Sequence, residues 1–264
     1  AHAVLGASSA YRWMACPGSV RMSAGIPSRS SRYADEGTAA HQLAERCLRE
    51  MYRLGGRRRA AEYVGETEAV RGQPWEVTEE MAEAVQVFVD AVAAANRDGD
   101  TLMIEQRFDL SATVRPGMFV SPSRKTLFVF DYKHGKGHAV EAVGNPQLRY
   151  YALGALLHTG APVARIAMTI VQPRAPHRDG PIRNETISAL DLLEWAADLK
   201  AAAVATEAAD APLKAGGHCG FCPAAGVCPA LRDRALEAAM ADFAGATITV
   251  PAQPASLPAR REGR

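Results

Sequence analysis

The sequence predicts an α/β or α+β protein, and two observations support this prediction. Residues 126–132 are an almost continuous apolar run with the length of a single strand, which indicates a strand buried on both faces. Longer segments, such as residues 36–54, instead repeat their apolar side chains with helical spacing. Helices interspersed with a few strands are typical of a sheet covered by helices.

The N-terminal stretch to about Ser31 is rich in Ser, Gly and Pro, and it predicts a loop around a short turn that holds Trp13. The first long helix is expected over Glu36 to Leu54, where a Gly-Gly pair ends it. The second is expected over Thr78 to Asn96, with Thr78 as its N-cap and two glutamates in its first turn.

The second half of the chain alternates strand and helix signals around the apolar run. A glycine-rich turn at residues 135–137 follows that run and precedes a further helix. The expected elements, in chain order, are a strand over Thr101 to Leu110, the strand over Thr126 to Tyr132, a helix over Pro146 to His158, a strand over Arg165 to Val171 and a helix over Asp191 to Ala209.

The length suffices for one large domain or two small ones. We expect a single domain over residues 1–249, followed by a proline-containing tail, 250–264, that we expect to be disordered. No apolar run approaches the roughly 20 residues that span a bilayer, and no secretory leader is recognisable, so we expect no membrane and a cytoplasmic location. The net charge of +1 means that a nucleic-acid partner would depend on local basic patches.

Four of the five cysteines are placed like a metal site drawn from both ends of the chain. Cys219, Cys222 and Cys228 share one short segment with turn-forming Gly and Pro residues, and Cys16 lies near the other terminus. In a cytoplasmic protein, clustered cysteines indicate metal ligation rather than disulfides. Four thiolates bind either Zn²⁺ or an iron–sulfur cluster. Cys47 falls on an apolar helix face and is expected to be a buried thiol.

Asp131 and Lys133 form an Asp-x-Lys pair at the end of the predicted buried strand. Side chains alternate along a strand, so both point to the same face. Phosphodiester hydrolysis needs a divalent metal that activates water and offsets phosphate charge, and a carboxylate at a strand end can hold that metal. The lysine can then stabilise the charge of the transition state.

Two residue pairs and one single residue have both an ordinary and a functional interpretation. Gly37 and His41, and likewise Gln147 and Tyr151, are four residues apart and therefore share a helical face. Each pair is also compatible with an ordinary amphipathic helix, and Glu105 by itself is an ordinary strand carboxylate.

Taken in order, these pieces resemble the RecB-like branch of the PD-(D/E)XK nuclease superfamily. That branch has a Gly-x-x-x-His helix, a Gly-x-x-Asp strand, an (Asp/Glu)-x-Lys and a Gln-x-x-x-Tyr helix. Cys16 lies upstream of these motifs and Cys219, Cys222 and Cys228 lie downstream; we call these four residues the cysteine bracket. This arrangement resembles the iron–sulfur subset of the branch, which includes AddB-type helicase–nucleases and CRISPR-associated RecB-like exonucleases. The local sequences of residues 8–17 and 33–38 also resemble those of a phage and prophage family of this type.

The resemblance implies a restriction-endonuclease-like mixed sheet flanked by helices, in which a [4Fe–4S] cluster on Cys16 and segment 219–228 ties the two chain ends together. It implies Mg²⁺ or Mn²⁺ at His41 and Asp131, with Glu105 assisting, and catalysis by Asp131 and Lys133. Gln147 and Tyr151 would position the strand. The implied activity is that of a DNA exonuclease in phage-type recombination or DNA processing, with DNA as substrate and a recombinase or single-strand-binding protein as a further partner.

The chain departs from the family at one point, because residues 115–125 contain no carboxylate where a Gly-x-x-Asp strand is expected. Metal binding would then depend on His41, Asp131 and a backbone carbonyl. The alternative interpretation is a catalytically inactive DNA-binding or scaffold module that retains the fold and the cluster. A zinc-binding interaction protein would account only for the cysteines.

Overall fold

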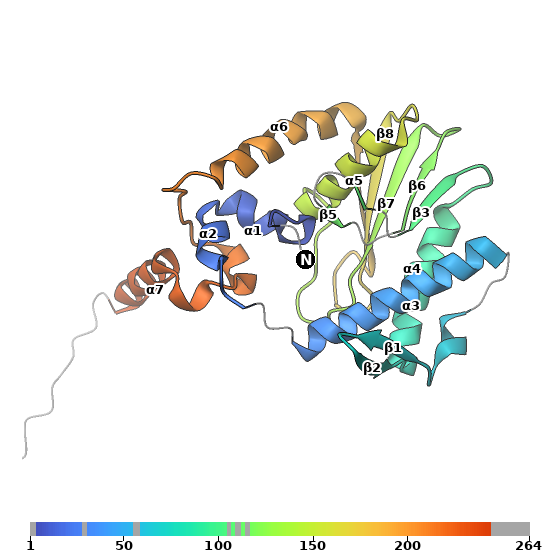
Figure 1. The fold of residues 1–264 in the computed structure, drawn as a ribbon, viewed down its shortest axis with the longest axis horizontal. Helices are drawn as coiled ribbons and strands as arrows, with labels where there is room; N and C mark the ends of the chain where they lie inside the picture. Colours follow the sequence, from blue (N-terminus) through green and yellow to red (C-terminus); the bar gives the residue numbers. More distant parts are fainter. Residues whose placement is uncertain are drawn as a thin grey trace, which may run out of the picture.

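A five-stranded mixed sheet lies at the centre of the computed structural model, which describes residues 4–27, 31–54, 59–104, 107–108, 112–113 and 117–243 (Figure 1). The strand order is β3-β6-β7-β8-β9, and β7 and β8 are its only parallel neighbours among the described strands. A parallel pair needs a crossover, which α5 (Pro146–Thr159) supplies. The strands are β3 (Thr101–Ile104), β6 (Gly117–Ser121), β7 (Thr126–Tyr132), β8 (Arg165–Val171) and β9 (Ile182–Ser188).

Helices cover both faces of this sheet. On one face lie α5 and α6 (Ala189–Ala205), together with the N-terminal α1 (Ala10–Ala15); α3 (Arg32–Leu54) and α4 (Glu79–Ala95) cover the other (Figure 1). Thr78 caps α4 as predicted, since its hydroxyl accepts a hydrogen bond from the Met81 N–H at 3.2 Å. None of the described helices is long and apolar enough to cross a bilayer.

The alternation of side chains along β7 divides the core in two. Leu127 and Val129 pack on the α5 side, whereas Phe130 and Tyr132 pack against α3 and α4. Both sets are buried, which confirms the prediction of a strand enclosed on both faces. Asp131 therefore belongs to the face covered by α5.

Smaller elements surround this core. The expectation of an N-terminal loop was wrong, because two short helices form there and Trp13 is buried on the first, donating from Nε1 to the Gly6 carbonyl at 3.2 Å. The remaining elements are η1 (Ala7–Ser9), α2 (Gly18–Ser23), η2 (Ala60–Tyr63), β1 (Thr67–Val70), β2 (Gln73–Glu76), β4 (Arg107–Phe108), β5 (Ala112–Thr113), η3 (Gly217–Phe221), η4 (Ala225–Val227) and α7 (Pro229–Asp242).

The bounds of two predicted strands, β7 and β8, are confirmed, and the predicted helices agree with α3, α4, α5 and α6 to within a few residues. The strand expected over Thr101 to Leu110 ends as β3 at Ile104, and only Arg107–Phe108 of its remainder is described, as β4. The β1–β2 hairpin, β9 and α7 were not predicted. The tail 250–264 and the last residues of the predicted domain lie outside the described residues.

The N-terminal helices dock onto the segment that follows α6. The Gly18 N–H donates to the Pro212 carbonyl at 3.0 Å, so the two backbones are in direct contact. A Cβ at Gly18 would lie 2.5 Å from the Ala211 carbonyl oxygen, closer than real Cβ atoms approach. This contact places Cys16 beside residues 211–219.

Gly18→Ala should therefore lower the free energy of unfolding by about 1–3 kcal/mol, because the added methyl group meets backbone that cannot rotate away. Chemical denaturation followed by circular dichroism measures the change. Gly37→Ala is the matched control: no atom lies within 4 Å of the Cβ built there, inside α3, so it should stabilise by roughly 0.5–1 kcal/mol. Equal stability of the two variants would contradict the docking described here.

Candidate active site and cysteine pocket

The end of β7 carries a chain of four interacting polar side chains. Asp131 is 2% exposed, and its Oδ2 lies 2.9 Å from Lys133 Nζ. Lys133 donates to Gln147 Oε1 at 2.7 Å, and Gln147 Nε2 donates to the Tyr151 hydroxyl at 2.8 Å. The structure thus brings together four residues that the sequence singled out in two separate motifs.

The start of α5 explains why Gln147 reaches the lysine. Asn145 caps the helix, its Oδ1 accepting from the Gln147 and Leu148 N–H groups at 2.9 and 3.1 Å, and Pro146 occupies the first turn. Leu148 is fully buried against the sheet. Gln147 and Tyr151, one turn apart, then lie along the same side of α5.

Asp131 Oδ2 is buried but has no hydrogen-bond partner, because its contact with Lys133 is an ion pair without hydrogen-bond geometry. Buried carboxylate oxygens are normally satisfied, and an unsatisfied one is costly. The Lys133 ammonium group offsets the charge of this oxygen at 2.9 Å, and a metal ion or a further hydrogen-bond donor would satisfy its remaining lone pairs. Asp131 is therefore the described residue at this site best suited to hold a metal.

The structure places His41 on α3, where its ring makes an edge contact with Tyr132 at 5.4 Å between centroids. Tyr132 belongs to the α3 side of β7, whereas Asp131 belongs to the α5 side. Glu105 lies outside the described residues. Across the described part of the chain, no three His, Cys, Asp or Glu side chains are arranged to hold a metal ion.

Sequence reasoning missed a second polar network on the α3 side of β7. His134, which is buried, contacts the Tyr132 hydroxyl with Nδ1 at 2.7 Å and Glu36 Oε1 with Nε2 at 3.1 Å. Arg174 donates to the same Glu36 oxygen at 2.7 Å. Glu36 stands next to Gly37 in the sequence, but its partners are far along the chain, so no local pattern indicates the network.

Burial, reinforced by the charge of Arg174, lowers the pKa of His134 to about 4. The imidazole is therefore neutral at pH 7. The arrangement that satisfies both contacts has Nε2–H donating to the Glu36 carboxylate and Nδ1 accepting from the Tyr132 hydroxyl. Although burial opposes it, the hydrogen bond and charge of Arg174 hold the pKa of Glu36 below its usual value.

The loop after Lys133 is fixed by one buried glutamine. Gln172 Nε2 donates to the Gly135 and His138 carbonyls at 3.0 and 2.8 Å. Its Oε1 accepts from the Val140 N–H at 2.9 Å and from Arg183 at 2.7 Å. The loop therefore has a defined path from β7 toward the N-terminus of α5.

The four bracket cysteines, Cys16, Cys219, Cys222 and Cys228, all line one small pocket. The Lys214 N–H points to Cys16 Sγ at 3.3 Å, and the Gly216 N–H points to Cys219 Sγ at the same distance. Backbone donors of this kind stabilise thiolates and tune iron–sulfur clusters. Cys16 therefore lies beside the segment that carries the other three cysteines, but among the described residues no three His, Cys, Asp or Glu side chains are arranged to hold a metal ion.

Cys47 is separate from this pocket. It is buried in the core between α3 and α4, where burial raises the pKa of its thiol to about 12. This agrees with its prediction as an inert buried thiol.

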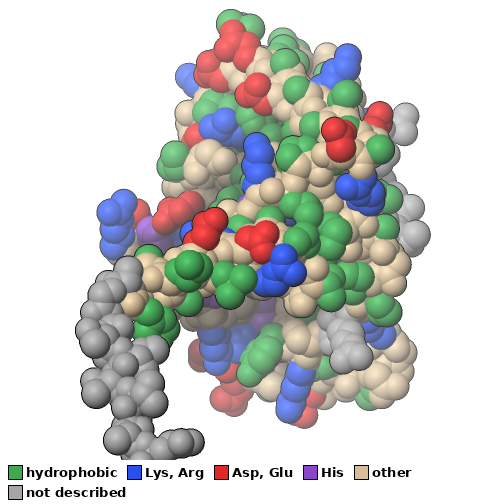
Figure 2. All heavy atoms as spheres, turned by 90° about the vertical axis from the view of Figure 1, so that its left-hand side faces the viewer, with side chains coloured by type: hydrophobic (Ala, Val, Ile, Leu, Met, Phe, Trp, Pro, Cys, Tyr) green, Lys and Arg blue, Asp and Glu red, His purple; other side chains and the backbone are tan. Residues whose placement is uncertain are grey.

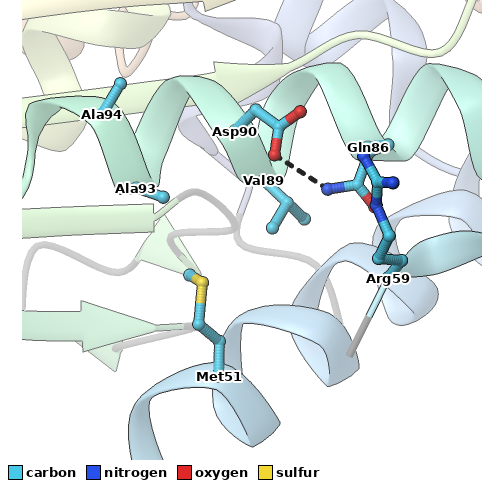
Figure 3. A pocket seen from close by; sticks show the side chains of 7 residues that line it. All are labelled: Met51, Arg59, Gln86, Val89, Asp90, Ala93 and Ala94. Carbon is cyan, nitrogen blue, oxygen red and sulfur yellow. Dashed lines mark hydrogen bonds between the residues drawn. The ribbon is translucent and has the colours of Figure 1, made fainter. Parts of the chain in front are cut away.

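A larger cavity of about 590 Å³ lies elsewhere, between α3 and α4 (Figure 3). Figure 3 shows Gln86 bonded to Asp90, at 2.9 Å, beside an apolar floor that includes Val89 and Met51. Its lining comes from the helical layer opposite Asp131, so it is not part of the candidate site.

The fold and site define an α/β protein with a mixed five-stranded sheet packed between helices. At the end of its central strand, the side chains of Asp131, Lys133, Gln147 and Tyr151 contact one another in series. The chain belongs to the DUF2800 family. The model of this family, described as a protein of unknown function (DUF2800), matches residues 2–261 and so covers nearly the whole chain.

The His134 network predicts a specific acid sensitivity. The pKa of His134 is about 4 in the folded state and about 6.5 in an unfolded chain, so the unfolded state binds more protons between these values. Stability should be fully present above pH 6.5 and fall as the pH drops toward 4, by up to about 3 kcal/mol from this group.

The measurement is the free energy of unfolding as a function of pH for the parent and for His134→Gln. The variant should lose the part of the pH dependence that lies between pH 6.5 and 4. His158→Gln, at an exposed histidine on α5, should keep the parental profile. Parallel curves for the parent and His134→Gln would show that His134 is not held neutral.

Proposed function

We propose that this protein is a metal-dependent DNA nuclease of the RecB-like PD-(D/E)XK type, with a restriction-endonuclease-like fold. The observation that supports it best is the buried, unbonded Asp131 Oδ2 beside a lysine that Gln147 holds in place. A carboxylate and an ammonium group on the same face of a strand end suit metal-assisted attack on a phosphodiester.

The order of the elements also supports this proposal. The Asp-x-Lys lies on the central strand β7, and the Gln-x-x-x-Tyr lies on α5, which crosses over to the parallel strand β8. A hydrogen-bonded chain joins the two motifs, which is an unusual outcome if each were an ordinary surface feature.

In this proposal Asp131 and His41 hold the metal, with Glu105 assisting. A bound Mg²⁺ or Mn²⁺ would activate water and offset charge on the phosphate. Lys133 would donate to the phosphate oxygens as charge develops on them, and Gln147 with Tyr151 would keep the ammonium group in position. Asp131 lies on the α5 side of β7 and His41 contacts Tyr132 on the α3 side, so His41 would have to move to reach the same ion.

A second candidate is supported by the hairpin strand β6. Its central side chains, Met118 and Phe119, are fully buried apolar groups, and it pairs with β7 only as far as Met118 opposite Val129. The described part of β6 thus supplies no carboxylate next to Asp131. An inactive DNA-binding or scaffold module that retains the fold is the alternative.

For the cysteine pocket we propose a structural [4Fe–4S] cluster on Cys16, Cys219, Cys222 and Cys228. The convergence of four thiols from both chain ends, with N–H groups directed at two of them, supports such a site. Zn²⁺ is the alternative occupant, since it also takes four thiolates. Because a cluster binds only the folded state, it would stabilise the docking of the N-terminal helices.

DNA end processing in phage-type recombination is the setting that this combination favours. A recombinase or a single-strand-binding protein would then be the natural protein partner.

The nuclease proposal predicts DNA degradation that requires Mg²⁺ or Mn²⁺ and stops with a chelator. Lys133→Ala should lower the cleavage rate by roughly a hundredfold or more while leaving DNA binding intact, because the lysine acts on transition-state charge. Asp131→Asn should lose cleavage and also Mn²⁺ binding, measured by calorimetry. Lys200→Ala, at an exposed lysine on α6, is the matched control and should cleave like the parent.

Cleavage by Lys133→Ala at the control rate would remove that residue from the mechanism. A parent that binds DNA and cleaves no single- or double-stranded substrate would favour the inactive module.

The cluster proposal predicts that anaerobically purified protein is brown and contains about four irons per chain. Cys16→Ala should lose the colour and lower the thermal midpoint, because it removes a ligand that joins the two chain ends. Cys47→Ser should retain both. A colourless parent with one equivalent of zinc would establish the alternative occupant.

A further inference from the structure

Phe221 stands between two of the pocket cysteines, yet its ring is 78% exposed and is not part of the pocket lining. The sulfurs of its neighbours, Cys219 and Cys222, belong to that lining. A phenylalanine left this exposed gains little from the fold itself, so its aromatic surface is free for a ligand.

The ring of Phe221 contacts the loop that follows the Asp-x-Lys motif. Its centroid lies 5.9 Å from that of His138, and the two rings are perpendicular. His138 is itself exposed and lies five residues after Lys133. Since five residues span at most about 18 Å, this aromatic pair lies within a few nucleotides' length of the lysine.

The position of this pair is set before any ligand arrives. Gln172 is 2% exposed, and its Nε2 donates to the His138 carbonyl at 2.8 Å. Arg183 also donates to the Val140 carbonyl at 2.9 Å, further along the same loop. Because the loop is already ordered, a ligand that stacks on the pair would not have to pay for ordering it.

Charges of both signs lie near this pair, so stacking would have to supply much of the affinity for a nucleic acid. On the end of the molecule formed by α7 and the cysteine segment, Lys and Arg side chains are interspersed with Asp and Glu (Figure 2). The net charge of the chain is only +1. Aromatic rings bind unpaired bases by stacking, whereas the bases of a duplex are already stacked on one another.

We propose that Phe221 and His138 form a stacking platform for the unpaired bases of a single-stranded DNA end, which they hold beside Lys133. This inference rests on the proposed nuclease function for the choice of DNA as the ligand. It adds a substrate class, single strands or frayed ends, and gives the cysteine segment a role in binding DNA.

The test is the binding of a fluorescein-labelled oligothymidylate to the full, cluster-loaded chain in EDTA, followed by fluorescence anisotropy. Phe221→Leu keeps the apolar character but removes the ring, and should weaken binding about fivefold or more. Phe221→Trp should bind at least as tightly as the parent. Phe243→Leu, at a similarly exposed ring at the end of α7, is the matched control and should bind like the parent.

Iron content and visible absorption are measured for every variant, so that loss of the cluster is not mistaken for loss of stacking. His138→Leu changes no residue of the cysteine segment, and it should also weaken binding. It provides the test if Phe221→Leu fails to load its cluster. Equal affinity of the parent, Phe221→Leu and His138→Leu would overturn the proposal. So would a parent that does not bind the oligonucleotide, or that prefers a blunt duplex of the same length.

The two proposals fail separately. Ring-dependent binding without any metal-dependent cleavage would leave the platform standing and remove the nuclease function. Metal-dependent cleavage by the parent, together with parental affinity of Phe221→Leu and His138→Leu for the oligonucleotide, would remove the platform and leave the nuclease function.

Discussion

Strand β7 is buried on both faces, and the contacts that position the candidate site start from it. Its odd-numbered side chains pack toward α5 and its even-numbered ones toward α3 and α4, so each face is held by a separate apolar core. Asp131 and Tyr132 are consecutive and therefore point in opposite directions. Asp131 faces the Lys133–Gln147 pair, whereas Tyr132 faces His134 and Glu36. On the α3 side, the contacts of Tyr132 thereby fix the strand end through side chains that have no part in the proposed chemistry.

The parts of the fold that the sequence predicts are those with strong local signals. The apolar run of β7 has no helical alternative, and α5 is marked by an asparagine cap followed by proline. Strand β9 was missed because it lies at the edge of the sheet and five of its seven side chains are polar, which masks an apolar strand pattern. The short helices α1 and α2 are held by tertiary docking, including the Gly18 contact, which local propensity does not report.

The candidate site, too, could be predicted only where its signals are local in the sequence. Asp131 with Lys133, and Gln147 with Tyr151, could be predicted because each pair has a spacing that puts both side chains on one face. The joining of the two pairs, and the network of Glu36, His134 and Arg174, depend on which distant segments meet in space. Sequence spacing does not encode such meetings. The position of Cys16 beside the other three cysteines could nevertheless be predicted, because a shared metal site would need all four thiols.

The cysteine segment and the end of β7 are linked by a series of contacts. Residues 211–219 contact the N-terminal helices through Gly18 and Cys16, and the same segment continues to Phe221, which meets His138. His138 in turn is tied through Gln172 to the loop that begins at Lys133. Two contacts, Phe221 with His138 and His138 with Gln172, therefore join the cysteine segment to the loop that follows the Asp-x-Lys. In the proposed function, a metal group in the cysteine pocket would stabilise this path without taking part in hydrolysis.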